Sequence, residues 1–393
     1  MFKKRDSGFF SNLRVPIAIM TLVGTAVGAG MLGIPYVVAK AGFLYGLILL
    51  LVLGVAFVYL HLFAGEVVLR TKGIHHQLTG YAEKYLGPNG KRVMTLALFI
   101  NIYGALTAYL IGEGITLHSI FNYSSPLLYS LLFFLLGVFI IYRGIKTLGR
   151  VELILISLLL LIIVGVGIFS YDHIDYSNLQ GFNPAYFFLP YGVILFAYMA
   201  SPAIPEMHEV LGPAKNKMKK AILIGGFIPV IIYIMFTFIV VGIVGWENFS
   251  VLGPSEQIAT VALGLYSNPV FGLLVNLIAV LAMFTSFLTL GTALVGVYNY
   301  DYGLSRNLSL VLTFALPLAI LLFDLATFIT VLGLTGAISG GLDGIMIILM
   351  YWKAKKIGRR KPEYSLGKHW VLGTALIIML ALGIVYELFS HFY

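Results

Sequence analysis

The 393-residue sequence contains no cysteine and few charged residues. The absence of cysteine excludes disulfides, thiolate metal sites and a cysteine nucleophile. Charged residues make up 10% of the chain, whereas an ordinary soluble domain carries roughly a quarter. A surface so poor in charge cannot be solvated mainly by water, so we expect a protein whose main solvent is the lipid bilayer.

Long apolar runs fill most of the chain, which is 60% hydrophobic with a mean hydropathy of +0.98. Each run exceeds about 18 residues or comes close to it, the length that crosses a roughly 30 Å hydrocarbon core as a helix. The runs are uniformly apolar, without the alternation of barrel strands, so we predict an all-α integral membrane protein. Eleven transmembrane helices are expected near residues 15–38, 43–69, 92–118, 126–143, 151–170, 185–210, 219–245, 268–297, 308–324, 326–350 and 370–390. The first run is too long for a signal-peptide core and is expected to stay in the protein.

The basic residues are arranged as topology signals, although the formal charge is +9. With these spans, 24 of the 25 Lys and Arg residues fall on alternate loops, and only Lys40 lies in the other set. Because cytoplasmic loops carry the excess of Lys and Arg, the pattern predicts a multi-pass protein of the cell membrane with a cytoplasmic N-terminus and an extracellular C-terminus. The basic residues form no face on a soluble module, so nucleic acid is not an expected partner.

Two predicted spans are interrupted by small residues and prolines. The interruptions in the first span are Gly24, Gly28, Gly30, Gly33 and Pro35, and those in the sixth are Ala197, Ala200, Ser201, Pro202 and Pro205. Because the two spans are five apart, the helices after each break run in opposite directions, as in the inverted repeats of secondary transporters. Residues 1–393 then form one membrane domain, with a first repeat over 15–170, a second over 185–350, and an additional helix over 370–390. The alternative is that the small residues serve only close helix packing.

Three segments carry a resemblance to a known family. Gly24-Thr-Ala-Val-Gly-Ala-Gly-Met-Leu-Gly-Ile-Pro35 resembles the first-span signature of the amino acid/auxin permease family, particularly its hydroxy and aromatic amino acid permease branch. Leu195-Phe-Ala-Tyr-Met-Ala-Ser-Pro-Ala-Ile-Pro-Glu206 is similar to that family's sixth span, and Thr285-Ser-Phe-Leu-Thr-Leu-Gly291 to its eighth. The resemblance implies the LeuT-type fold of the amino acid/polyamine/organocation superfamily, with five plus five inverted helices. It also implies a symporter that imports neutral amino acids, aromatic ones among them, by alternating access.

The resemblance further implies where the substrate binds. It places the substrate carboxylate near Gly28, Ala29 and Gly30, where an unwound stretch would expose amide N–H groups at a positive half-helix end. The remaining substrate contacts that it implies are Thr25, Tyr103, Thr107, Tyr109, Phe196, Ala197, Tyr198 and Ser201. The alternative for the tyrosines is that aromatic residues, 14% of this chain, mainly anchor helices at the lipid interface.

The same resemblance implies one sodium ion as the coupling ion and no other cofactor. Its ligands would come from Gly24 and Val27 in the first span and from Ala282, Thr285 and Ser286 in the eighth, because a hard cation prefers oxygen ligands. Met31 stands where some relatives use an asparagine at a second ion site, so we expect no second sodium. The alternative for Thr285 and Ser286 is hydrogen bonding to the preceding helical turn.

Carboxylates inside the spans keep a proton-coupled mechanism open, because a charged acid at mid-membrane needs a partner or a function. Glu113 and Asp343 lie deep and are the candidate proton carriers. Glu66 and Glu206 lie near the predicted cytoplasmic ends, where pairing with loop lysines or an inner gate would explain them.

The sequence shows no constellation typical of an enzyme, such as a metal-spaced histidine cluster or a nucleophile beside a base. No filter motif indicates a channel. A non-transporting amino acid sensor on the same fold stays an alternative. The expected partners are therefore an amino acid substrate and the lipid bilayer, and we expect the monomer to be the functional unit.

Overall fold

The computed structural model describes residues 8–73, 77–144 and 174–390, together with isolated positions between 157 and 172. Within these ranges every regular element is a helix, so the predicted all-α architecture is confirmed. The predicted fifth span, at 151–170, lies outside the continuously described residues.

Seven helical segments of the described chain are long and apolar enough to cross a membrane, and the bent pair at the N-terminus makes an eighth. They include α3 (Phe43–Arg70), α4 (Leu78–Phe121), α5 (Pro126–Arg143), α9 (Met218–Val244), α12 (Pro269–Gly296) and α16 (Trp370–Ser390). A shorter apolar helix, α13 (Arg306–Leu322), follows α12. The chain is therefore a multi-span membrane protein, and the full set of eleven spans stays a prediction.

The first predicted span is two helices, α1 (Gly8–Ala26) and α2 (Ala29–Ala41), which meet at an angle of 53°. Between them Gly28 adopts an extended backbone conformation, with φ −150° and ψ −148°. The sixth predicted span is also two helices, α7 (Leu189–Tyr198) and α8 (Ala203–Leu211), separated at residues 199–202. Both interruptions expected from the sequence are therefore breaks in the helices.

The tenth predicted span contains an irregular turn. It comprises α14 (Phe328–Thr335), a π-helical turn over Gly336–Gly340, and α15 (Gly341–Ile357). The glycine at 336 is required by packing, since a Cβ there would lie 1.9 Å from the carbonyl oxygen of Gly192. This turn thus lets α14 and α15 approach the backbone of α7 closely.

The third helix begins earlier than the span predicted from residue 92. It starts at Leu78 and passes a kink at Gly87, whose φ is 77°. Apolar runs could not reveal this first part, because residues 78–86 include Glu83 and Lys84 on a helix whose other face buries Tyr81 and Ala82. An amphipathic helix of this kind has no continuous hydrophobic run.

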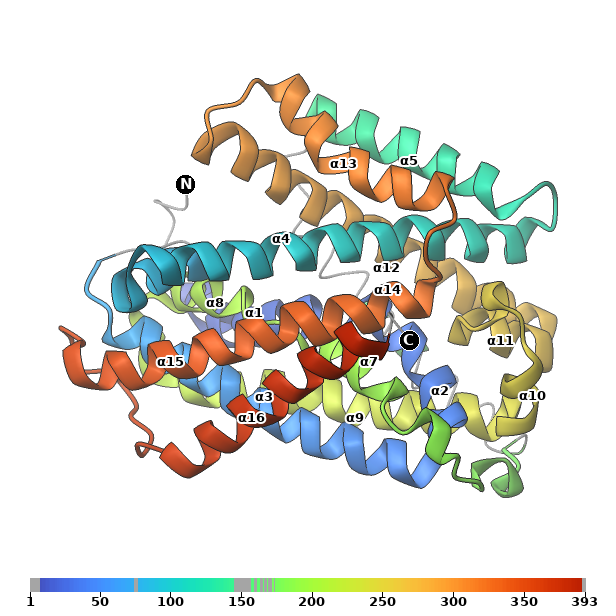
Figure 1. Cartoon of the computed structure of the whole chain (residues 1–393), viewed down its shortest axis with the longest axis horizontal. Coiled ribbons are helices and arrows are strands. Elements are labelled where there is room, and N and C mark those ends of the chain that lie inside the picture. Colours follow the sequence, from blue (N-terminus) through green and yellow to red (C-terminus); the bar gives the residue numbers. More distant parts are fainter. Residues whose placement is uncertain are drawn as a thin grey trace.

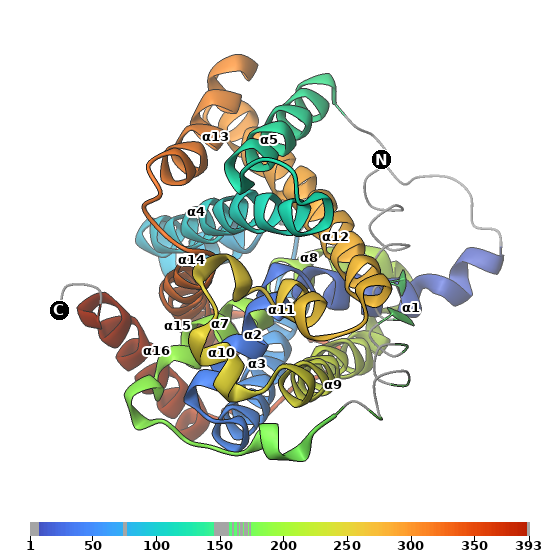
Figure 2. The ribbon, with the colours of Figure 1, turned by 90° about the vertical axis from the view of Figure 1, so that its right-hand side faces the viewer.

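Three of the four half-helices, α2, α7 and α8, lie toward the centre of the bundle, whereas α1 extends outward to its edge (Figure 2). Figure 2 shows α2, α7 and α8 surrounded by α3, α4, α9 and α12, with α5, α13 and α16 toward the periphery. Two short helices, α10 (Trp246–Val251) and α11 (Ala259–Tyr266), connect α9 to α12. In Figure 1 the long helices run roughly parallel to the long axis of the molecule.

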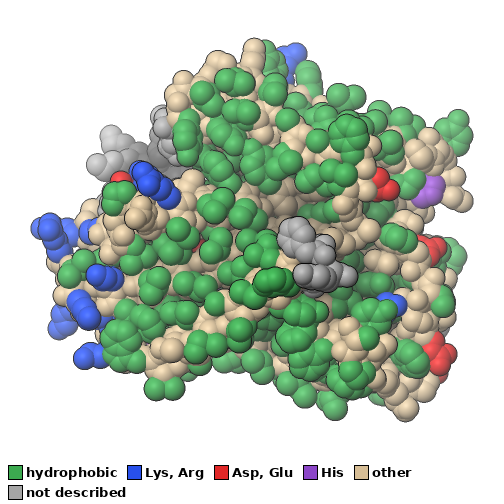
Figure 3. All heavy atoms as spheres, in the orientation of Figure 1, with side chains coloured by type: hydrophobic (Ala, Val, Ile, Leu, Met, Phe, Trp, Pro, Cys, Tyr) green, Lys and Arg blue, Asp and Glu red, His purple; other side chains and the backbone are tan. Residues whose placement is uncertain are grey.

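The surface has the charge distribution of a protein in a bilayer. Apolar side chains cover the middle of the face in Figure 3, and Lys and Arg gather at the end where α15 finishes and α4 begins. Exposed apolar residues such as Leu132, Leu135 and Leu382 are 54%, 62% and 63% accessible. These side chains have lipid as their natural solvent.

Replacing Gly30 by alanine is expected to destabilise the protein, because the added Cβ would lie 2.7 Å from the Cα of Ala197. The backbone of the second break would have to move, and overpacking of this kind lowers the free energy of unfolding by about 1–3 kcal/mol. Thermal unfolding in detergent measures the effect. The control is Gly253→Ala, whose Cβ would meet its nearest atom, Glu256 Oε2, at 3.7 Å. Equal melting temperatures for the two variants would contradict the close contact between the breaks.

Candidate substrate and ion site

The two helix breaks meet in the core, so four helix ends come together. The backbone of Gly30 lies against Ala197, and α2 packs along α7 while α1 packs along α8. The N-terminal ends of α2 and α8 carry partial positive charge, whereas the C-terminal ends of α1 and α7 carry partial negative charge. Such a junction can hold both charged groups of a zwitterion, with an anion at the amides of residues 28–30.

Aromatic side chains approach the junction from two sides. On α4, the hydroxyl oxygen of Tyr109 lies 3.6 Å from the position that a Cβ of Gly28 would occupy. Phe196, in the last turn of α7, is only half-buried. The ring of Tyr198 turns toward α3, where its hydroxyl donates to the carbonyl of Leu50 at 3.1 Å. Tyr109 and Phe196 therefore lie beside the break region. The hydroxyl of Tyr198, which the resemblance places at the substrate, is instead bonded to α3 and is not part of the site proposed below.

Three residues expected at the substrate have their hydroxyls engaged elsewhere. The hydroxyls of Tyr103 and Tyr298 are 2.6 Å apart, and Tyr103 donates to the carbonyl of Leu312 at 2.9 Å. Thr107 and Thr25 each donate to the carbonyl four residues earlier, at 2.7 and 2.8 Å. These bonds direct Tyr103 toward the end of α12 and α13, away from Gly28. The Tyr103 hydroxyl is therefore engaged away from Tyr109, whereas the roles of Thr25 and Thr107 at the substrate stay predictions.

A tyrosine that the sequence did not single out lies at the junction. Tyr233, in the middle of α9, has no exposed surface. Its hydroxyl lies 2.8 Å from the carbonyl oxygen of Ala26 and 2.9 Å from that of Ala197. In the sequence it is one of 24 tyrosines, and the only signal was a polar tip in the middle of an apolar run.

Among the residues expected to bind sodium, Thr285 shows the local hydrogen bonding that was the alternative. The Thr285 hydroxyl donates to the carbonyls of Ala282 and Leu281, at 3.0 and 3.2 Å. A hydroxyl that donates its proton keeps its lone pairs for an acceptor role, so this bond leaves Thr285 able to bind a cation. Val27 is 2% exposed, while Gly24 and Ser286 are half-buried.

The two deep carboxylates have different surroundings. Asp343 accepts a hydrogen bond from Ser201, in the break between α7 and α8. Asp343 and Ser201 both line a narrow cavity, which extends to Gln77 and Thr79 at the start of α4. Glu113 is fully buried, and among the described residues neither of its oxygens has a hydrogen-bond partner. No group of three or more histidine or acidic residues that could hold a metal is found in the described parts of the chain.

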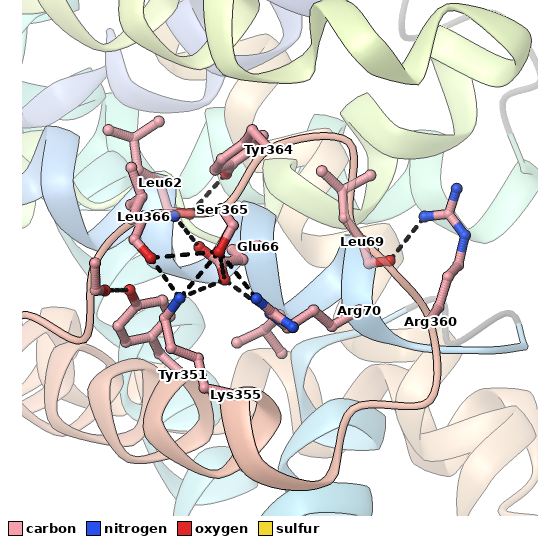
Figure 4. A network of polar contacts seen from close by, with 12 residues as sticks. Leu62, Glu66, Leu69, Arg70, Tyr351, Lys355, Arg360, Tyr364, Ser365 and Leu366 are labelled. Atoms are coloured by element: carbon pink, nitrogen blue, oxygen red, sulfur yellow. Dashed lines mark hydrogen bonds and ion pairs between the residues drawn. The ribbon is translucent and has the colours of Figure 1, made fainter.

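Glu66, in α3, is the centre of a polar cluster at the end of the bundle where α15 finishes (Figure 4). It is fully buried and receives Arg70 Nε at 2.7 Å, Lys355 Nζ at 2.9 Å and the backbone N–H of Leu366 at 2.7 Å. The segment between α15 and α16 is also tied to α3 by Tyr364, whose hydroxyl donates to the Leu62 carbonyl at 2.6 Å. The expected pairing of Glu66 with basic residues is present, and it joins α3, α15 and this segment.

Comparison with known proteins gives a consistent picture. Residues 14–390 match the tryptophan/tyrosine permease family. The tyrosine-specific transport systems 1 and 2 of Haemophilus influenzae are 26% and 25% identical, with 93% and 91% of this chain and 94% and 92% of theirs covered. Glutamine transporter 2 of Aliivibrio fischeri is 24% identical over 83% of this chain and 86% of its own.

One solved structure with a similar fold is the crystal structure of MhsT in complex with L-phenylalanine. The TM-score is 0.67 at 16% sequence identity, and the match covers 95% of this chain and 98% of MhsT. This similarity shows that the chain has a LeuT-like fold, as the sequence resemblance implied.

Substituting Glu66 by glutamine is expected to lower the free energy of unfolding by about 3 kcal/mol, because two cations lose their shared, buried counter-charge. Chemical denaturation in detergent measures the change. The control is Glu83→Gln, because Glu83 pairs with Lys91 at 2.9 Å while both side chains are 50% exposed, and such a pair contributes less than about 1 kcal/mol. A similar loss in both variants would show that the cluster adds nothing beyond a surface ion pair.

Proposed function

Because the chain belongs to the tryptophan/tyrosine permease family, and so is an amino acid transporter and not an enzyme, we propose that it imports an aromatic amino acid by ion-coupled symport. The observation that carries the proposal is the contact between the two helix breaks at Gly30 and Ala197. Tyrosine and tryptophan are the first candidates, since two relatives are named as tyrosine transporters. The relative named for glutamine makes that amino acid the natural competitor to test.

The proposed binding mode uses the helix ends at the junction. The substrate carboxylate accepts hydrogen bonds from the amides of residues 28–30, at the positive end of α2. Tyr109 and Phe196 supply the aromatic surface for the side chain, and Ser201 bounds the site on the α8 side. The substrate site is proposed to open alternately to the two sides of the membrane when the two broken spans tilt, since each half-helix can move without its other half. We further propose that the monomer carries out the whole cycle.

Sodium is the proposed coupling ion, held by the carbonyls of Gly24, Val27 and Ala282 with the hydroxyls of Thr285 and Ser286. Support comes from Thr285, a residue that is 5% exposed and whose hydroxyl oxygen retains its lone pairs. One positive charge entering down about 100 mV contributes roughly 2.3 kcal/mol. At about 1.4 kcal/mol per decade this supports an accumulation of roughly 50-fold.

A proton is the second candidate for the coupling ion, favoured by the surroundings of Asp343. Asp343 is the one ionisable side chain among the residues that line the narrow cavity. That cavity begins near the start of α4 and ends at the α7–α8 break, where Ser201 donates to the carboxyl group. A proton arriving through water there would change the charge beside the broken helix. Glu113 offers a second buried carboxyl group on α4.

Uptake into proteoliposomes under an inward sodium gradient, and separately under an inward proton gradient, is expected to distinguish the two ions. Sodium coupling predicts uptake of labelled tyrosine or tryptophan that follows the sodium gradient. Thr285→Ala then raises the sodium concentration for half-maximal uptake by about tenfold or more, since it removes an oxygen ligand. The control is Thr289→Ala, one turn along α12, whose hydroxyl has no hydrogen-bond partner among the described residues.

Proton coupling predicts instead uptake that ignores sodium and is abolished by Asp343→Asn. Its control is Asp324→Asn, at an exposed position. Failure of all amino acids tested to enter under either gradient would reject transport and leave the sensor as the leading function.

The topology proposed is eleven spans, five plus five inverted and one added, with a cytoplasmic N-terminus and an extracellular C-terminus. Because the chain lacks cysteine, one introduced cysteine is the only labelling site. We expect Ser255→Cys to react with a membrane-impermeant maleimide on intact cells, and Lys217→Cys to react only after permeabilisation. Both positions are exposed, so the reverse pattern would place the N-terminus outside.

A further inference from the structure

Tyr233 joins the two helix breaks from the side of α9. Ala26 is the last residue of α1, and Ala197 is the next-to-last residue of α7. In a continuous helix their carbonyls would accept from the N–H groups of residues 30 and 201, but both helices have ended before that turn. The Tyr233 hydroxyl lies 2.8 and 2.9 Å from these two oxygens. One phenolic O–H is therefore shared between two carbonyl oxygens, one in each predicted half of the chain.

The surroundings hold this phenol in place. Tyr233 is fully buried, and its ring packs against that of Tyr198 with centroids 5.2 Å apart. Helix α9 itself packs against α1, α2, α3 and α8. Neither water nor lipid reaches the hydroxyl, so no solvent molecule could replace it as donor to the two carbonyls.

We propose that Tyr233 is a positioning residue for the amino acid site. Its hydroxyl keeps the C-terminal ends of α1 and α7 together, and this sets the distance between the amides of residues 28–30 and the aromatic side chain at Phe196. It also engages a lone pair on each of two carbonyl oxygens at the negative helix ends, Ala26 and Ala197. The inference rests on the proposed function for its consequence on substrate affinity, whereas the link between the breaks stands on the contacts alone.

The chain offers a matched control in Tyr198. This residue is buried beside Tyr233, being 3% exposed, and its hydroxyl also donates to a backbone carbonyl. That carbonyl belongs to Leu50, in the interior of α3, so it already accepts a bond from its own helix. Removing the Tyr198 hydroxyl leaves no helix end without a donor, which is the difference between the two sites.

The first measurement is the equilibrium dissociation constant of labelled tyrosine and tryptophan for purified Tyr233→Phe and Tyr198→Phe. We expect Tyr233→Phe to raise the dissociation constant and KM about tenfold or more, and Tyr198→Phe to change them less than about twofold, a tenfold change being about 1.4 kcal/mol. Introducing 4-aminophenylalanine at position 233 restores an N–H donor at the same point and is expected to recover the affinity. A merely structural role would lower the number of active molecules and the melting temperature while the dissociation constant of the folded fraction stayed the same, and that outcome would overturn the proposal.

Hydrogen–deuterium exchange supplies a measurement that needs no substrate. Without the hydroxyl, amides in both breaks, over residues 26–31 and 197–203, are expected to exchange about tenfold faster than in the wild type and in Tyr198→Phe. Unchanged exchange at either break would overturn the link. If the wild-type protein binds no amino acid, the proposed function fails. Hydrogen–deuterium exchange still tests whether Tyr233 links the two breaks.

A variant that keeps the phenol guards against misfolding. If Tyr233→Phe does not fold, 3,5-difluorotyrosine at position 233 provides a stronger donor with nearly the same shape. Slower exchange at both breaks supports the proposal, and unchanged exchange contradicts it.

Discussion

Backbone amides and carbonyls that lose their helical partners inside a membrane must find others, and this constraint governs the centre of the molecule. Two helices end there, at Ala26 and Tyr198, and restart at Ala29 and Ala203. Lipid supplies no hydrogen bonds, so the free groups have to be turned inward and paired. On the α9 side, the carbonyls of Ala26 and Ala197 share the hydroxyl of Tyr233 as donor. The amides at residues 28–30 lie at the positive N-terminal end of α2, where an anionic ligand can accept from them.

The close packing of the breaks follows from the same constraint. Small residues are needed at Gly30 and Gly336, because a side chain at either would collide with the backbone of α7. For Gly30, which lies next to the first break, the two interpretations of the sequence, close packing and an interrupted helix, therefore both hold. Small residues let the backbones touch, and the contact is what brings the four helix ends into one site.

Polar groups away from the junction are handled in two different ways. Glu66 lies where the bundle meets the basic end of the molecule, and it is neutralised by Arg70 and Lys355. Within the described parts of the chain, Glu113 and Asp343 have no cationic partner, and Asp343 has only the hydroxyl of Ser201. The first arrangement ties helices together. The second leaves carboxyl groups whose charge is not fixed by a neighbour, which is why the proton remains a second candidate beside sodium.

Much of the architecture could be predicted from the sequence. The lengths of the apolar runs predicted the described long helices, and clusters of glycine, other small residues and proline predicted both breaks. Each of these signals lies within one segment of the chain. The first part of α4 escaped prediction, since an amphipathic helix at residues 78–86 has no apolar run.

Which side chains gather at the junction was decided by tertiary structure alone. Resemblance grouped Tyr103 with Tyr109, yet six residues along α4 turn them to different faces, and Tyr103 reaches Tyr298 instead. Tyr233 was not distinguishable from the other tyrosines by any local pattern. Its role depends on α9 crossing two helix ends, at Ala26 and Ala197, that are 171 residues apart in the chain. A hydrogen bond of that kind is set by the packing of whole helices. Composition and spacing therefore determine that this protein spans the membrane with two broken helices. Only the folded bundle determines which side chain bonds the free carbonyls at the breaks.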